Sequence, residues 1–137
     1  MVNKPKIQGT AFETLTVNKL NDYGFKAKRL AEGGSNDKGD IECENPFLDI
    51  LPYPKIIFEA KHRANLNVHQ TLAKSKEKAG GDVIVAWKKT KRKGNSKVRV
   101  ADGERVVYIV DEDLMFRLLE DYKGSFNSNL KETFNAE

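Results

Sequence analysis

The chain has 137 residues, of which 39% are hydrophobic and 32% are charged, and its formal net charge is +4. This composition is typical of one soluble globular domain with a heavily charged surface, and the single cysteine, Cys43, excludes an internal disulfide and a multi-cysteine zinc site. No apolar run approaches the length that spans a bilayer and the N-terminal residues lack the apolar core of a signal peptide, so we expect a cytoplasmic protein with no membrane partner.

The first predicted element is an amphipathic helix that follows a short arm. Residues 1–8 are polar and carry a proline, which favours an arm, and residues 10–23 are predicted to be helical with Gly24 as the C-terminal cap. The apolar positions of this helix share one face: Phe12, Leu15, Val17 and Leu20. Glu13 falls inside the same face, so it either points toward the core for a functional reason or is a first-turn acid that the helix dipole favours.

Three strands are predicted next, separated by a glycine-rich loop and a proline-rich turn. Residues 25–31 alternate as in an edge strand, residues 32–39 carry loop signals, and residues 40–44 alternate again. The proline-rich stretch 45–54 turns the chain back into an apolar strand over residues 56–61.

The strand over residues 56–61 is apolar except for Glu59 and Lys61. Alternation places these two side chains on the same side of the strand, about 7 Å apart. In an antiparallel hairpin, Asp40 at the start of one strand lies beside Glu59 at the end of its partner. Two acids and an amine at one strand end indicate a metal and a substrate, and the alternative interpretation is an exposed cross-strand ion pair.

A helix and a further strand follow, and they predict a parallel crossover. Residues 68–79 are predicted to be helical and to end at Gly80, and residues 82–87 form the next buried strand. Three lysines are expected on the outer side of the helix: Lys74, Lys76 and Lys78. The basic stretch 88–94 is interpreted as a mobile loop.

The C-terminal part of the chain predicts a hairpin and a last helix. Residues 98–100 and 105–110 are expected to pair with each other, and Asp111 is expected to cap the helix. Three leucines of this helix are expected to point inward: Leu114, Leu118 and Leu119. The polar tail 124–137 is expected to be disordered, which leaves residues 9–123 as the folded domain.

Positive charge is concentrated between residues 74 and 99, where Lys and Arg far outnumber acids, and the sign reverses beyond residue 111. A basic face suits a polyanion such as nucleic acid. We expect the run after the 82–87 strand to contact phosphates without reading bases, although a solvated loop is the alternative. The run consists of Lys88, Lys89, Lys91, Arg92 and Lys93.

This chain resembles the PD-(D/E)xK nuclease superfamily in the order of its charged residues. In both, an acid on a helix is followed by an acid that opens a hairpin strand and by an acid-x-Lys motif that ends the partner strand. Within this superfamily, the chain is most similar to the Holliday junction resolvases of archaea and their phage relatives. The residues that carry the resemblance are Gly9 and Glu13, Tyr23-Gly24-Phe25 through Arg29, Ser35 through Asp40-Ile41, Phe58-Glu59-Ala60-Lys61, and Gly80 through Lys88. The resemblance implies a single α/β domain of the restriction-endonuclease-like kind, with a mixed β-sheet flanked by helices.

The resemblance also implies roles for individual residues. Asp40 and Glu59 would bind magnesium with the carbonyl of Ala60, Glu13 would complete the acidic cluster, and Lys61 would orient or activate water. Hard oxygen ligands suit Mg²⁺, and Mn²⁺ is expected to substitute for it. The expected DNA contacts outside the basic run are Arg29, Ser35, His62, Arg63 and Gln70.

The function that follows from the resemblance is magnesium-dependent cleavage of branched DNA, with four-way junctions cut in pairs by a homodimer. The alternatives are a nuclease of the same fold that cuts linear duplex, flap or nicked DNA, and a DNA-binding relative that has lost catalysis. Cleavage of a four-way junction beside a matched linear duplex, with and without magnesium, separates the three.

Overall fold

The described residues form one mixed β-sheet and three helices. The computed structural model describes residues 4–30, 39–44, 55–92, 94, 99–101, 103 and 105–135. In chain order the elements are α1 (Lys4–Asp22), β1 (Lys26–Arg29), β2 (Ile41–Glu44), β3 (Lys55–Arg63), α2 (Val68–Ala79), β4 (Val83–Arg92), β5 (Arg99–Ala101), β6 (Val107–Ile109) and α3 (Glu112–Asn135). Ser35 and Lys93, two of the predicted DNA contacts, lie outside the described residues.

The sheet combines antiparallel and parallel pairing. β1, β2 and β3 pair antiparallel, with Ile41 opposite Phe58, and β3 pairs parallel with β4, with Glu59 opposite Val85. The parallel pair is joined through α2, as the sequence predicts. The other edge of β4 pairs antiparallel with β6 and then, further along, with β5.

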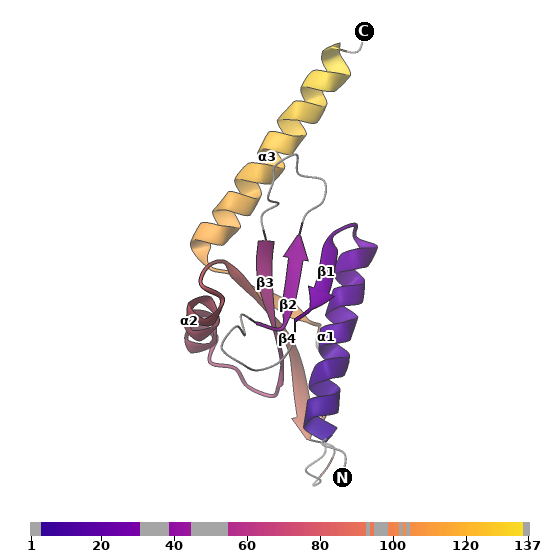
Figure 1. Ribbon diagram of the computed structural model, residues 1–137, viewed down its shortest axis with the longest axis vertical. Coiled ribbons are helices and arrows are strands. Elements are labelled where there is room, and N and C mark those ends of the chain that lie inside the picture. Colours follow the sequence, from indigo (N-terminus) through magenta and orange to yellow (C-terminus); the bar gives the residue numbers. More distant parts are fainter. Residues whose placement is uncertain are drawn as a thin grey trace.

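The helices α1 and α2 lie on opposite faces of the sheet (Figure 1). The ring of Phe12 on α1 lies 6.2 Å from the ring of His62, whereas the Nζ of Lys78 on α2 lies 3.4 Å from the Oε1 of Glu59. Because successive side chains of a strand point to opposite faces, β3 presents Phe58 and His62 to α1 and presents Glu59 and Lys61 to α2. The predicted fold class, an α/β domain with a mixed sheet flanked by helices, is confirmed.

The core lies between the sheet and α1. Its buried members are Ile41, Cys43, Phe58, Ile84 and Leu114, and Val17 and Leu20 of α1 pack against them. Cys43 is therefore a core residue, as expected, and burial raises the pKa of its thiol.

The helix α2 has the predicted bounds and defined ends. The side chain of Asn67 accepts a hydrogen bond from the N–H of Gln70 at 3.1 Å, which caps the first turn. At the other end Gly80 adopts a left-handed conformation, with φ of 71°, and donates to the carbonyl of Lys76 at 2.9 Å. These caps fix where α2 begins and ends relative to β3.

The strand β4 is longer than predicted, and the prediction of a mobile loop over residues 88–94 is wrong for 88–92. The strand continues to Arg92 because its backbone pairs with β3 as far as Lys89 and with β5 from Thr90 onward. Thr90 is fully buried within this basic stretch. Backbone pairing with β3 and then with β5 outweighs the local charge, which the sequence pattern alone does not show.

The predicted hairpin between residues 98–100 and 105–110 is also wrong. β5 pairs with Thr90–Arg92 and β6 pairs with Val85–Trp87, so each strand uses β4 as its partner. A short hairpin has little stability alone, and an edge of a longer strand offers more backbone partners to each segment.

Both terminal helices are longer than predicted. α1 begins at Lys4 within the predicted arm, and α3 continues to Asn135 through the tail that was expected to be disordered. Figure 1 shows α3 extending well beyond the sheet. Only Leu114 of the three predicted inward leucines is buried, whereas Leu118 and Leu119 are 40% and 48% exposed.

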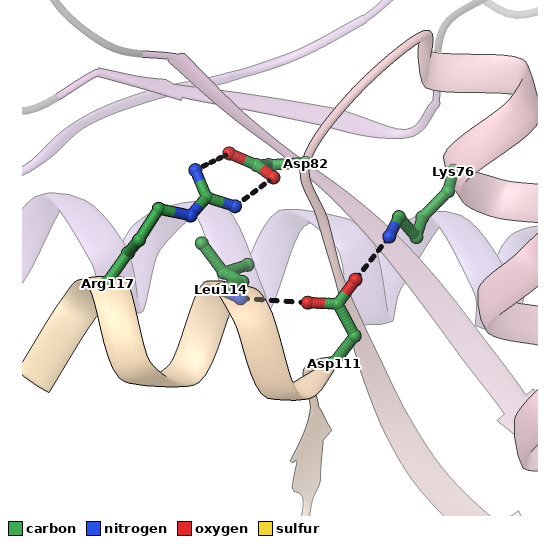
Figure 2. Close-up of polar contacts among 5 residues, drawn as sticks. All are labelled: Lys76, Asp82, Asp111, Leu114 and Arg117. Atoms are coloured by element: carbon green, nitrogen blue, oxygen red, sulfur yellow. Dashed lines mark hydrogen bonds and ion pairs between the residues drawn. The ribbon is translucent and has the colours of Figure 1, made fainter.

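The start of α3 is fixed to the rest of the domain by two ion pairs (Figure 2). Arg117 donates two hydrogen bonds to Asp82, of 2.8 and 2.6 Å, and Lys76 of α2 pairs with Asp111. Asp111 also caps the helix, as predicted, by accepting from the N–H of Leu114 at 2.8 Å. These contacts lower the pKa of both Asp82 and Asp111, in each case chiefly through the hydrogen bond to the cation.

Within the part of the chain that the structure describes, no helix has the length and apolar character needed to cross a membrane.

Candidate active site

Asp40 and Glu59 are brought together by the pairing of β2 with β3. The N–H of Asp40 donates to the carbonyl of Phe58 at 3.2 Å, and the N–H of Ala60 donates to the Oδ2 of Asp40 at 2.8 Å. These two bonds bracket Glu59, so the carboxylate of Asp40 is held beside it. The sequence-based prediction that residues 19 positions apart become neighbours at this strand end agrees with this register.

Gly39 allows the chain to enter β2 close to β3. Its φ of 150° is one that side chains rarely adopt, and a Cβ there would collide with the Cγ2 of Ile57 and would lie 3.4 Å from the Oε1 of Glu59. A larger residue at this position would therefore move Asp40 away from β3 or push Glu59 out of place.

Glu59 is almost completely buried, at 4% exposure, and its electrostatic environment is unusual for an acid. The pKa of Glu59 is raised to about 7, first by burial and then by the neighbouring Asp40, while the cations of Lys78 and Lys61 oppose the rise. The Nζ atoms of these lysines lie 3.4 Å from Oε1 and 4.0 Å from Oε2 respectively. Oε1 is nonetheless buried without a hydrogen bond.

The donor set of Asp40 and Glu59 fits a hard divalent cation. Two carboxylates close together repel each other when both are ionised, and a cation between them would relieve that repulsion and occupy the unbonded Oε1. Magnesium is commonly bound by one or two carboxylates together with waters and substrate phosphates. Among the described residues, no group of three or more His, Cys, Asp or Glu side chains is placed to hold a metal ion, so the pair is the candidate centre.

Glu13 is paired with Arg29 of β1. Its Oε2 accepts a hydrogen bond from the Nε of Arg29 at 3.0 Å and forms an ion pair with the Nη2 at 2.9 Å. Glu13 belongs to α1, which covers the face of the sheet opposite to the one that carries Glu59. The roles of Glu13 and of the Ala60 carbonyl as metal ligands, and that of Arg29 as a DNA contact, stay predictions.

The predicted DNA contacts on β3 and α2 divide between the two faces. His62 lies on the α1 side, where burial and then the charge of Lys88 lower its pKa. Arg63 lies on the α2 side and is exposed, and its carbonyl accepts from the indole N–H of Trp87 at 2.9 Å. Gln70 is exposed in the first turn of α2 and lines a cleft with Lys61.

The basic run of β4 also divides between faces, because it is a strand and not a loop. Lys88 lies over the ring of Phe12, 6.0 Å from its centroid, so it faces α1. Alternation then places Lys89 and Lys91 on the face that carries Glu59, and Arg92 on the face of Lys88. Of the four, only Lys89 and Lys91 share a side with the acidic pair.

Sequence reasoning missed Lys78. The three lysines predicted on the outer side of α2 point in different directions, since Lys78 contacts Glu59 and Lys76 contacts Asp111. The signal was the four-residue spacing of Gln70, Lys74 and Lys78, which places them on one helix face. That face becomes meaningful only once α2 is known to cover Glu59.

Comparison with known proteins finds a likeness at the level of structure. No family model and no curated protein matches the chain. A solved structure, that of the Holliday junction resolvase Hjc from the archaeal hyperthermophile Archaeoglobus fulgidus, is similar to this chain with 22% sequence identity and a TM-score of 0.40. The match covers 76% of this chain and 84% of the resolvase chain.

Proposed function

We propose that this chain is a magnesium-dependent endonuclease that hydrolyses the phosphodiester backbone of branched DNA, with four-way junctions as its substrate. The observation that carries the proposal is the pairing of Asp40 with the buried carboxylate of Glu59, with Lys61 4.0 Å from Glu59. A buried carboxylate with an unbonded oxygen, such as Glu59, destabilises the fold, and a metal-binding role explains why it is present.

The residues of the site divide the chemistry among them. Asp40 and Glu59 would hold the cation, which when bound neutralises charge on a phosphate and lowers the pKa of a water. Lys61 adds a positive charge on the same wall, where an attacking oxygen and a phosphate oxygen would meet. The oxygen donors suit Mg²⁺, and Mn²⁺ should substitute because it also accepts carboxylate and water ligands.

Branched DNA as the substrate, and a homodimer as the working form, follow from the motif resemblance described above together with the exposed surface of α3. A nearly two-fold symmetric junction requires two cuts, so two copies of the site are needed. Exposed apolar side chains on α3 offer a surface for a second copy: Met115, Phe116, Leu119 and Tyr122. The alternative function is cleavage of linear, flap or nicked DNA by the same site.

The test compares a four-way junction with a linear duplex of matched sequence, each with magnesium and with a chelator. We expect magnesium-dependent cleavage of the junction in paired strands and little cleavage of the duplex. Lys61→Ala should bind the junction without cutting it, and Lys19→Ala, which changes the same charge on α1 far from the strand end, should cut normally. Equal cleavage of both DNAs would favour the alternative function. If neither DNA is cut in the presence of magnesium or manganese, the nuclease proposal is rejected.

A further inference from the structure

The face of α2 that covers the sheet carries polar side chains at nearly the same spacing as the polar side chains on the facing side of β3. On β3 the residues Glu59, Lys61 and Arg63 share one side, and each step of two residues advances about 7 Å. Across from them, Gln70, Lys74 and Lys78 recur every four residues on one helix face, about 6 Å apart. Because Lys78 contacts Glu59 and Gln70 lines a cleft with Lys61 and Arg63, the two rows run in opposite directions and stay nearly in register.

A cleft opens between these two rows, one step beyond the acidic pair. Its volume is about 180 Å³, and its lining residues are Lys61, Arg63, Gln70, Thr71, Lys74 and Ser75. Three of the six are cations, two carry hydroxyls, one carries an amide, and none is an acid. Within the described residues neither Arg63 nor Lys74 makes an ion pair, so their charges are not neutralised by a neighbouring carboxylate.

We propose that this cleft between β3 and α2 is a binding site for a phosphate group, and that it holds a backbone phosphate of DNA adjacent to the one beside Asp40 and Glu59. Cations combined with hydroxyl and amide donors, with no acid present, are the donor set that recognises phosphate oxygens. Lys61 borders both the acidic pair and the cleft, so a strand that fills the cleft is fixed relative to the carboxylates. Arg63 and Lys74 are positioning residues in this scheme.

The assignment rests in part on the proposed nuclease function, so its test separates phosphate binding from cleavage. The first measurement is an NMR titration of the metal-free protein with inorganic phosphate, which follows the amide signals of Thr71, Lys74 and Ser75. We expect these signals to move with one common dissociation constant, and Lys74→Ala should weaken that constant by about tenfold, the scale of one charge-assisted hydrogen bond. Lys19→Ala is the matched control and should leave it unchanged.

The second measurement uses DNA, which distinguishes a backbone phosphate from free phosphate as the natural ligand. In chelator, the slope of the logarithm of the binding constant against the logarithm of salt concentration should fall by about 0.9 in Lys74→Ala for duplex arms, and should not change in Lys19→Ala. Thr71→Val removes a hydrogen-bond donor without changing the charge. It should therefore weaken the binding of inorganic phosphate but leave the salt slope of DNA binding unchanged.

The outcomes are distinguishable. If Lys74→Ala and Lys19→Ala behave alike in both measurements while the parent protein cuts DNA, the cleft is not a phosphate site and the nuclease stands. If Lys74→Ala changes both measurements but no DNA is cut in magnesium or manganese, the cleft stands and the nuclease fails. A change with inorganic phosphate alone, and none in the DNA slope, overturns the assignment to a DNA backbone phosphate.

Discussion

The N–H of Ala60 donates a hydrogen bond of 2.8 Å to the Oδ2 of Asp40, so the backbone that follows Glu59 holds the second carboxylate of the pair. The bond runs across the β2–β3 pairing and depends on its register. It holds Asp40 directly beside Glu59, a carboxylate whose pKa is raised. The two acids thus lie side by side in different environments, since Glu59 is buried and Asp40 is partly exposed.

Asp40→Asn should keep this geometry and remove the charge, because an amide oxygen can still accept from the N–H of Ala60. DNA cleavage should fall at least about 100-fold, the scale on which loss of one preorganised electrostatic group slows catalysis. DNA binding should be retained, because the variant removes a negative charge from a site that faces phosphates.

A second readout of the same variant does not depend on activity. Since the charge of Asp40 contributes to the raised pKa of Glu59, that pKa should fall toward its ordinary value in Asp40→Asn. Carboxyl ¹³C NMR of the metal-free protein measures it. A normal cleavage rate at saturating magnesium would remove Asp40 from the site.

Glu59 should make the stability of the metal-free protein depend on pH. Its pKa is about 7 in the folded protein, against an ordinary value of 4.5, so the folded state binds its proton more tightly than the unfolded state does. The stabilisation from this proton is present below about pH 4.5 and is lost as the pH rises toward 7, with a total of roughly 3 kcal/mol.

Glu59→Gln lacks this titration, so the comparison isolates it. In chelator, the free energy of unfolding of the variant minus that of the parent should increase between pH 4.5 and 7 and then level off. Urea unfolding at several pH values gives the difference, in which the other titrating groups cancel. A difference that stays flat across this interval would mean that Glu59 ionises at its ordinary pKa.

Lys91 and Arg92 are neighbours on β4, but only Lys91 lies on the face of the acidic pair. Lys91→Ala should therefore reduce the salt slope of junction binding by about 0.9, and Arg92→Ala should change it little. Affinity should fall for every DNA sequence alike, because phosphate contacts carry no sequence information. Equal effects of the two variants would indicate that the stretch contacts DNA as a loop, as the sequence pattern favoured.

The exposed apolar face of α3 should mediate self-association. Sedimentation at micromolar concentration should find the parent protein as a dimer and Leu119→Glu as a monomer, because the substitution places a charge in the proposed contact. Leu15→Glu provides the control, since Leu15 of α1 is equally exposed, at 50% against 48%. A parent protein that is monomeric both free and on a junction would contradict the dimer.

The sequence predicts those parts of the fold that depend on local hydrophobic pattern and capping. The helix 68–79 has its predicted bounds because Asn67 and Gly80 cap it, and the β3–α2–β4 crossover follows from its spacing. The proximity of Asp40 to Glu59 could be predicted because, in an antiparallel pair, the start of one strand lies beside the end of its partner.

The rest of the fold and of the site depends on tertiary contacts, which a local sequence pattern does not contain. Residues 88–92 are strongly basic, and they are a strand because their backbone pairs with β3 as far as Lys89 and with β5 from Thr90 onward. Lys78 reads as a solvated residue until the packing of α2 places it against Glu59. The exposure of Leu118 and Leu119 likewise follows from where α3 leaves the sheet, which its own amphipathic pattern does not specify.

Lys76 and Lys78 leave α2 in directions that differ by about 200°, because each residue advances the helix by about 100°. One contacts Asp111 at the base of α3, and the other contacts Glu59. Both contacts favour the same rotation of the helix about its axis, since turning it by one residue would move both lysines away from their partners. Through these two ion pairs, α2 connects the base of α3 to the wall of the acidic pair on the opposite side of the helix.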